Sequence, residues 1–238
     1  MRRVIPLLVT LMTSMASAQD DTEGAIPDGY SDEDYEREAA KRLEGTSRVS
    51  IIGGWRYAPN FTFYDNYYFK RDNRALERSR GAIGGPLLTG TFAYSVTELI
   101  EVGIDLFTTY ERMELTNKPG LNAVTFGALV GLRFQKRLEL GNRVVIPSVG
   151  ALFGPIVAAS YFDGGQSVER GQQALGFTGG ATLKLSKQWG LCFELRYLFA
   201  SGDVKDVGPF NAGGTWLGVG MTYSFPWQNE NTRIHGKI

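Results

Sequence analysis

Charged side chains recur at alternate positions within apolar segments of this 238-residue chain. Six of them lie in segments with the alternation of β-strands: Glu101, Asp105, Arg133, Lys184, Glu194 and Arg196. In a strand, this spacing places the charges on one face and the apolar side chains on the other. Acids and bases that share a face can pair with one another, or line a narrow path for ions or water. We expect these charges to form an ion-paired network that fills the interior of the fold. The alternative is a narrow path for ions or water that is gated by the same pairs.

Residues suited to enzymatic or metal chemistry are scarce. The chain has one cysteine, Cys192, and one histidine, His235. One cysteine excludes an internal disulfide, and no Cys/His cluster suggests a zinc site. Cys192 falls on the same face as the charges, where we expect a small packed side chain. The sequence therefore predicts no catalytic residue, no metal and no cofactor.

Aromatic and basic residues follow one another between residues 59 and 86. The members that we single out are Tyr67, Tyr68, Phe69, Lys70, Arg71, Arg74, Arg78 and Arg80. Aromatic side chains followed by cations could dock another surface or bind lipopolysaccharide phosphates, for which arginine geometry is suited. Phe61 and Phe63 fall on the same strand face as Trp55 and Tyr57. The strand at 48–57 could therefore simply continue through them with this face outward. For the basic run, a solvated loop is the simpler interpretation.

Eight alternating segments position these residues. We expect strands at 48–57, 88–96, 100–106, 124–135, 143–160, 175–185, 191–199 and 215–225. The segment 143–160 is nearly all apolar, but Pro147 and Pro155 oppose a helix because proline in a helix interior removes a hydrogen bond and clashes. A lipid-facing Arg or Lys near the membrane midplane would cost ~2–4 kcal/mol, which explains why the charges share the inward face.

The connections between these strands alternate in length. Short ones are expected at Thr97-Glu98, at 136–142 and at 187–190, and long ones at about 59–86, 111–122, 161–173 and 201–213. Bacterial outer-membrane barrels have short periplasmic turns and longer outer loops. Each outward stripe has about five or six positions, enough to cross a membrane when the strand is tilted. The pattern predicts an all-β fold, a transmembrane antiparallel up-and-down β-barrel with eight strands, ten being less favoured.

The two ends of the chain differ from the barrel segment. Residues 1–18 have a charged start, a short apolar run and a small-residue cleavage site, which predict a secretory signal peptide. Residues 19–47 carry ten acidic and three basic side chains, as in a flexible periplasmic arm. Within it, Ser31 and Asp34 could cap a short helix that ends at Gly45. Residues 226–238 would form a periplasmic tail.

The last expected strand reads T-W-L-G-V-G-M-T-Y-S-F over Thr215–Phe225. Its order Gly220, Tyr223, Phe225 resembles the closing-strand signal that barrel insertion machinery reads in bacterial outer membranes. With the eight strands and the loop pattern, residues 48–225 resemble a small eight-stranded outer-membrane barrel of the OmpA/OmpX type. The tail is too short for the periplasmic peptidoglycan-binding domain of some such barrels.

The resemblance also limits an enzymatic role. Some small outer-membrane barrels modify lipid A, and the deacylase type uses a Ser-His-acid arrangement. His235 lies beyond the barrel segment and cannot serve such a triad, and acyl transfer of another design has no support in the sequence. We predict that the chain is not an enzyme.

Three functions fit the pattern. The first is a structural or adhesion-like surface role of an outer-membrane barrel through its outer loops. The second is an anchor for an envelope-spanning motility or secretion assembly, engaged through residues 19–47. The third is a narrow pore for ions or small molecules. The implied partners are outer-membrane lipids, lipopolysaccharide and the insertion machinery, whereas the near-zero net charge gives no reason to expect nucleic acid.

Overall fold

The computed structural model describes residues 43–60, 63, 84–115, 118–162, 167–204 and 208–225. All of them belong to one unit of the chain. Among these residues, no helix is long and apolar enough to cross a membrane. The expected signal peptide, the short helix near Ser31 and the tail lie outside the described residues.

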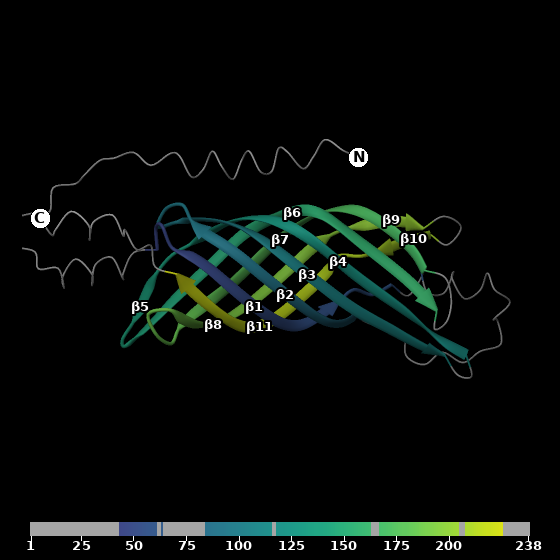
Figure 1. Ribbon diagram of the computed structural model, residues 1–238, viewed down its shortest axis with the longest axis horizontal. Helices are drawn as coiled ribbons and strands as arrows, with labels where there is room; N and C mark the ends of the chain where they lie inside the picture. Colours follow the sequence, from purple (N-terminus) through teal and green to yellow (C-terminus); the bar gives the residue numbers. More distant parts are fainter. Residues whose placement is uncertain are drawn as a thin grey trace, which may run out of the picture. The chain divides into compact units, whose positions relative to one another are not determined.

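Eight strands form a closed antiparallel barrel (Figure 1). They are β1 (Ser47–Tyr57), β2 (Gly84–Ser95), β3 (Ile100–Leu115), β4 (Lys118–Gln135), β6 (Arg143–Phe162), β7 (Ser167–Lys184), β8 (Trp189–Phe199) and β11 (Gly214–Phe225). Each strand pairs with the barrel strands before and after it, and β1 pairs with β11 to close the circle. The all-β fold, the up-and-down topology and the count of eight rather than ten barrel strands are therefore confirmed.

Three shorter strands lie outside this circle. The strand β5 (Leu138–Leu140) pairs with the start of β6. Beyond the other end of the barrel, β9 (Ser201–Val204) and β10 (Gly208–Asn211) pair with each other in a separate two-stranded sheet. Figure 1 shows β5 at one end of the barrel and β9 and β10 at the other.

The alternation along each strand separates two surfaces. On β2, for example, Leu88, Phe92 and Tyr94 are exposed on the outer surface, while the alternate residues Thr89, Thr91 and Ala93 are buried. The same relation holds on β8, where Leu191, Phe193 and Leu195 are exposed and Cys192 and Arg196 are buried. On these strands, charged and small side chains thus face the interior, and a row of large apolar side chains faces outward.

Two of the expected long connections are wrong. The segments at 111–122 and 161–173 are largely strand, because β3 pairs with β4 up to Leu115 and Lys118, and β6 pairs with β7 up to Tyr161 and Ser167. Alternating apolar residues show where one face of a strand lies in an apolar environment. The hydrogen bonds between strands do not depend on apolar side chains. The strands continue after the apolar stripe has ended. The short connection expected at 136–142 likewise contains β5.

The outward interpretation of Phe63 is also wrong. This side chain is buried and packs edge-on against Phe210, with ring centroids 4.9 Å apart. Strand β1 ends at Tyr57, and Ala58 and Asn60 that follow it are buried. The chain therefore turns over the end of the barrel instead of extending the outward stripe.

The end of the barrel that holds the short turns also receives the residues before β1. Gly45 N donates to Ser95 O, and Ser95 N donates to Thr46 O. The carboxylate of Glu98 accepts hydrogen bonds from Leu43 N at 3.0 Å and Glu44 N at 3.3 Å. We call the end of the barrel with these contacts the short-turn end, and the opposite end the long-loop end. These contacts fix where the segment before β1 joins the barrel.

Candidate functional site

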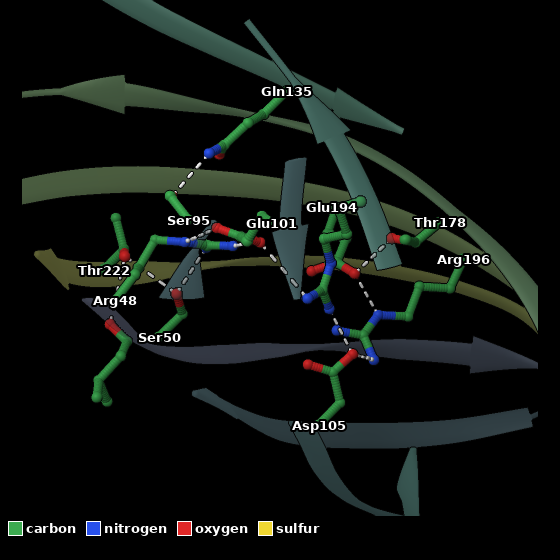
Figure 2. Close-up of polar contacts among 12 residues, drawn as sticks. Arg48, Ser50, Ser95, Glu101, Asp105, Gln135, Thr178, Glu194, Arg196 and Thr222 are labelled. Atoms are coloured by element: carbon green, nitrogen blue, oxygen red, sulfur yellow. Dashed lines mark hydrogen bonds and ion pairs between the residues drawn. The ribbon is translucent and has the colours of Figure 1, made fainter. Parts of the chain in front are cut away.

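The interior nearest the short-turn end holds a cluster of ion pairs (Figure 2). Its members, which we call the lumen charge network, come from four strands: Arg48, Glu101, Asp105, Arg133, Glu194 and Arg196. Each occupies an inward position of its strand, where alternation places it. Three arginines face three carboxylates, so the network is balanced in charge.

Asp105 is the centre of this network. Its Oδ2 lies 2.5 Å from Arg133 Nη2 and 3.0 Å from Arg196 Nη1, and its side chain is fully buried. Arg196 also donates from Nε to Glu194, whose Oε1 accepts a 2.6 Å hydrogen bond from Thr178 Oγ1. Charged hydrogen bonds between buried partners are strong and geometrically selective. This half of the network ties β3, β4, β7 and β8 together across the interior.

Glu101 holds the other half. Arg48 donates two hydrogen bonds to its carboxylate, from Nη2 to Oε1 at 2.6 Å and from Nε to Oε2 at 3.0 Å. Arg133 Nη1 lies 3.5 Å from the same Oε1, so Arg133 connects Glu101 with Asp105. Arg48 in turn donates to Ser50 Oγ. The network therefore runs without interruption from β1 to β8.

Lys184 was predicted to share this network, and the structure places it apart. Its Nζ donates to Ser224 Oγ at 2.5 Å. Within the described part of the chain it forms no salt bridge with a carboxylate. Lys184 is the last residue of β7, so it belongs to the short-turn rim rather than to the network.

An apolar layer follows the network inside the barrel. Phe107 and Trp216 meet edge to face with their centroids 4.5 Å apart, and the Arg196 guanidinium lies 5.9 Å from the Trp216 ring centroid. The remaining buried members include Leu87, Leu129, Leu152, Ile156, Leu198, Phe63 and Phe210. Large side chains from many strands thus occupy the middle of the barrel.

A second buried ion pair lies toward the long-loop end. Arg56 on β1 and Glu111 on β3 form a salt bridge, and neither side chain is exposed. Arg56 Nη1 also donates to Ala212 O at 2.6 Å and to Thr125 Oγ1 at 3.4 Å. Sequence reasoning missed this pair because Glu111 fell in an expected loop. The parity of Glu101 and Asp105, continued along β3, would have found it.

The stem of the first long connection is anchored at this end. Asn60 Nδ2 donates to Asn211 O at 3.0 Å, and its Oδ1 accepts from Asn211 N at 2.7 Å. Together with Phe63 on Phe210, these bonds hold this stem over the barrel. The aromatic and basic residues singled out between Tyr67 and Arg80 lie outside the described residues.

The expected insertion residues all lie on β11. A Cβ at Gly220 would sit 2.0 Å from the Ile51 carbonyl oxygen, so only glycine fits between the strands there. Tyr223 faces outward between two aromatic neighbours, with centroids 5.0 Å from Trp189 and 4.7 Å from Phe225. Cys192 is a buried free thiol on β8, and His235 lies outside the described residues.

No protein-family model and no curated protein matches the chain. Among solved structures, Ail, the attachment invasion locus protein of Yersinia pestis, shares 16% identity, with a TM-score of 0.46 over 77% of this chain and 100% of that one. The outer membrane protein OprG of Pseudomonas aeruginosa shares 10%, with a TM-score of 0.46 over 78% and 98%. Neisserial surface protein A shares 15%, with a TM-score of 0.48 over 76% and 98%.

The resemblance to small barrels that the sequence predicts holds in strand number and topology. The fold assignment itself rests on the strand pairing observed in this chain.

Proposed function

We propose that this protein is a β-barrel of the bacterial outer membrane, closed to solutes along its interior, that acts through the segments at its ends. The observation that carries this proposal is the distribution of side chains. Arg56, Asp105 and Glu111 are fully buried inside, while large apolar side chains from all eight barrel strands are exposed outside. A soluble lipocalin-like barrel would show the reverse.

The exposed apolar surface supports a membrane location. It includes Ile51 on β1, Leu106 on β3, Val149 on β6 and Val219 on β11, each about 60% exposed. An apolar surface that continues around the barrel far exceeds the patches that soluble monomers expose to water. In a bilayer, the same surface faces acyl chains, and a closed barrel pairs its strands without leaving a free sheet edge.

We infer the orientation from the two longest connections, β1–β2 and β8–β11, which lie at the end where β1 ends and β11 begins. Short turns join β2 to β3 and β7 to β8 at the end where β1 begins and β11 ends. Short turns face the periplasm in bacterial outer-membrane barrels. We therefore assign the short-turn end to the periplasm, and the β1–β2 connection to the cell surface.

Three successive layers support a closed interior. The lumen charge network fills the periplasmic half, the layer around Phe107 and Trp216 fills the middle, and the pair Arg56–Glu111 lies beyond it. Eight-stranded barrels leave an interior just wide enough for side chains. These layers support a plugged lumen over the narrow pore.

We propose that the first outer loop supplies surface interactions through residues Tyr67 to Arg80. The anchored stem supports this role, because Asn60 on Asn211 and Phe63 on Phe210 fix the base from which the loop leaves the barrel. An interacting segment on a rigid scaffold loses less entropy on binding. Lipopolysaccharide phosphates remain the ligand class that its arginines fit best.

The test of this function combines two measurements on the full protein. Migration of outer-membrane samples on gels with and without boiling reports a folded barrel, and trypsin shaving of intact cells reports exposure of the first loop. We expect a mobility shift together with cleavage between Lys70 and Arg80. A protein recovered from the soluble periplasm without a shift would sink the proposal.

One observation favours a second candidate, an anchor for an envelope assembly engaged through the acidic arm. The carboxylate of Glu98 and the backbone of Ser95 hold residues 43–46 at the periplasmic rim. A chain segment that leaves a rigid rim is well placed to bind a periplasmic partner. Deleting residues 20–40 should leave barrel folding intact and abolish co-purification of such a partner. Unchanged co-purification would exclude the arm as the handle.

A further inference from the structure

The hairpin at the periplasmic end extends beyond its neighbours. β4 and β5 pair with β6 in one continuous register, with Gln135 opposite Ser148, Lys136 N bonded to Pro147 O, and Leu138 opposite Val145. The adjacent strand β3 begins only at Ile100, opposite Phe134. In the described structure, residues 136–140 therefore have a partner strand on one side only.

The outward face of this hairpin continues the apolar exterior of the barrel. Leu138 lies opposite Val145 and Leu140 opposite Arg143, and these positions share the parity of the outward residues of β6. Leu138 is 38% exposed and Leu140 is 62% exposed. Two leucines at the very end of a hairpin would be unfavourable in water, since each buried leucine gains ~1.5–3 kcal/mol. We infer that they lie in lipid.

The charges of the hairpin divide between its faces. Arg137 and Glu139 have the inward parity and form an ion pair of 3.5 Å. Lys136 and Arg143 have the outward parity and are exposed. Neither forms an ion pair with any carboxylate among the described residues, and the same holds for Lys187, exposed in the turn between β7 and β8. The outward face thus carries uncompensated positive charge beside exposed leucines.

The rest of the periplasmic rim is built differently. Exposed or half-exposed aromatic rings gather on β2, β4, β8 and β11, namely Tyr94, Phe134, Trp189, Tyr223 and Phe225. Such rings anchor a membrane protein at the level of the headgroups. Residues 136–149 contain no aromatic residue at all. Cations replace the aromatic anchors on this side.

We propose that the outward face of the β5–β6 hairpin binds the phosphate groups of anionic phospholipids in the periplasmic leaflet. Leu138 and Leu140 would lie among the acyl chains. Lys136 and Arg143, with Lys187 on the neighbouring turn, extend their stems along this apolar surface and place their charges at the phosphates. The surface is continuous with the lipid-facing exterior, so this proposal rests on the outer-membrane function proposed above.

The test is lipid selection by the full folded protein. The barrel is reconstituted in phosphatidylcholine nanodiscs that contain phosphatidylglycerol, and the lipids retained after mild extraction are counted by native mass spectrometry. The wild type should retain phosphatidylglycerol in preference to phosphatidylcholine. The triple variant Lys136→Gln, Arg143→Gln, Lys187→Gln should lose this preference, on the order of fivefold for each charge removed. The matched control is Arg112→Gln, an exposed cation near the opposite end of β3.

Three results would overturn the proposal. The wild type could show no preference, the triple variant could match the wild type, or Arg112→Gln could reduce the preference as much as the hairpin charges do. Folding of each variant is checked by heat-modifiable migration. A barrel that fails to insert into nanodiscs contradicts the outer-membrane function as well, whereas insertion without lipid preference contradicts this inference alone.

Discussion

Arg56 on β1 and Glu111 on β3 form their salt bridge across the intervening strand β2. Gly85 of β2 is the residue opposite Arg56, and a Cβ added there would lie 3.2 Å from Glu111 Cα. Because Gly85 has no side chain, the guanidinium and the carboxylate can meet over β2. The closed end of the barrel therefore depends on a charge pair and on a glycine that makes room for it.

Breaking this pair should destabilise the barrel strongly. Glu111→Gln leaves the Arg56 charge buried without its carboxylate, and loss of one partner of a buried pair costs about 3–5 kcal/mol. The double variant Arg56→Met, Glu111→Leu removes both charges and should recover most of that loss. Urea unfolding in lipid vesicles measures both. A Glu111→Gln variant within about 0.5 kcal/mol of wild type would contradict the role of the pair.

The glycine can be tested on its own strand. A Cβ at Gly85 would sit 1.7 Å from the Tyr110 carbonyl oxygen, whereas a Cβ at Gly90 meets nothing within 4 Å. Gly85→Ala should force β2 from β3 and cost at least about 1–3 kcal/mol. Gly90→Ala is the control and should fold as wild type does. Equal unfolding midpoints for the two variants would show that the close approach of β3 to Gly85 has no energetic weight.

The centre of the lumen charge network makes a third prediction. Asp105→Asn removes the carboxylate that lies between Arg133 and Arg196. The buried guanidinium groups of Arg133 and Arg196 then lose the carboxylate that lies between them. We expect the free energy of unfolding to fall by about 3–5 kcal/mol. The control is Glu139→Gln, because exposed pairs contribute about 0–1 kcal/mol. If both variants unfold at the same urea concentration, the network does not stabilise the barrel.

A fourth prediction concerns the contact of Glu98 with the segment before β1. Glu98→Gln removes the charge that accepts hydrogen bonds from Leu43 N and Glu44 N. Hydrogen bonds to charged groups contribute about 1.5–3 kcal/mol, so these two amides should exchange with deuterium roughly tenfold faster or more. The amide of Gly45, bonded to Ser95 O, serves as an internal reference. Unchanged exchange at Leu43 would mean that Glu98 does not hold this segment.

Alternation predicted much of the fold, because each inward and outward face leaves a period of two in the sequence. The positions of Asp105, Arg133 and Arg196 on one interior surface follow from that period alone. Which acid meets which base does not, since pairing depends on register. Arg133 lies directly opposite Glu101 on the neighbouring strand but makes its shorter contact with Asp105.

The alternation of apolar residues failed to predict strand where the strands continue beyond the apolar exterior. β3 continues to Leu115 and β4 begins at Lys118, although the outward residues there are no longer regularly apolar. Glu111 was hidden for this reason. Phe63 misleads in the opposite way. It has the outward phase of β1, which left open an extension of the strand, but β1 ends at Tyr57 and Phe63 packs against Phe210. Neither a turn over the barrel nor a contact with Phe210 leaves a periodic signal.

The most direct test of the closed membrane barrel is ion conductance of the purified, heat-modifiable protein in planar lipid bilayers. With the lumen charge network, the Phe107–Trp216 layer and Arg56–Glu111 in place, we predict insertion without stable channel openings. The variant Phe107→Ala, Trp216→Ala, Asp105→Asn, if it remains heat-modifiable, should conduct where the wild type does not. Stable ion-conducting steps in the wild type would contradict the closed interior.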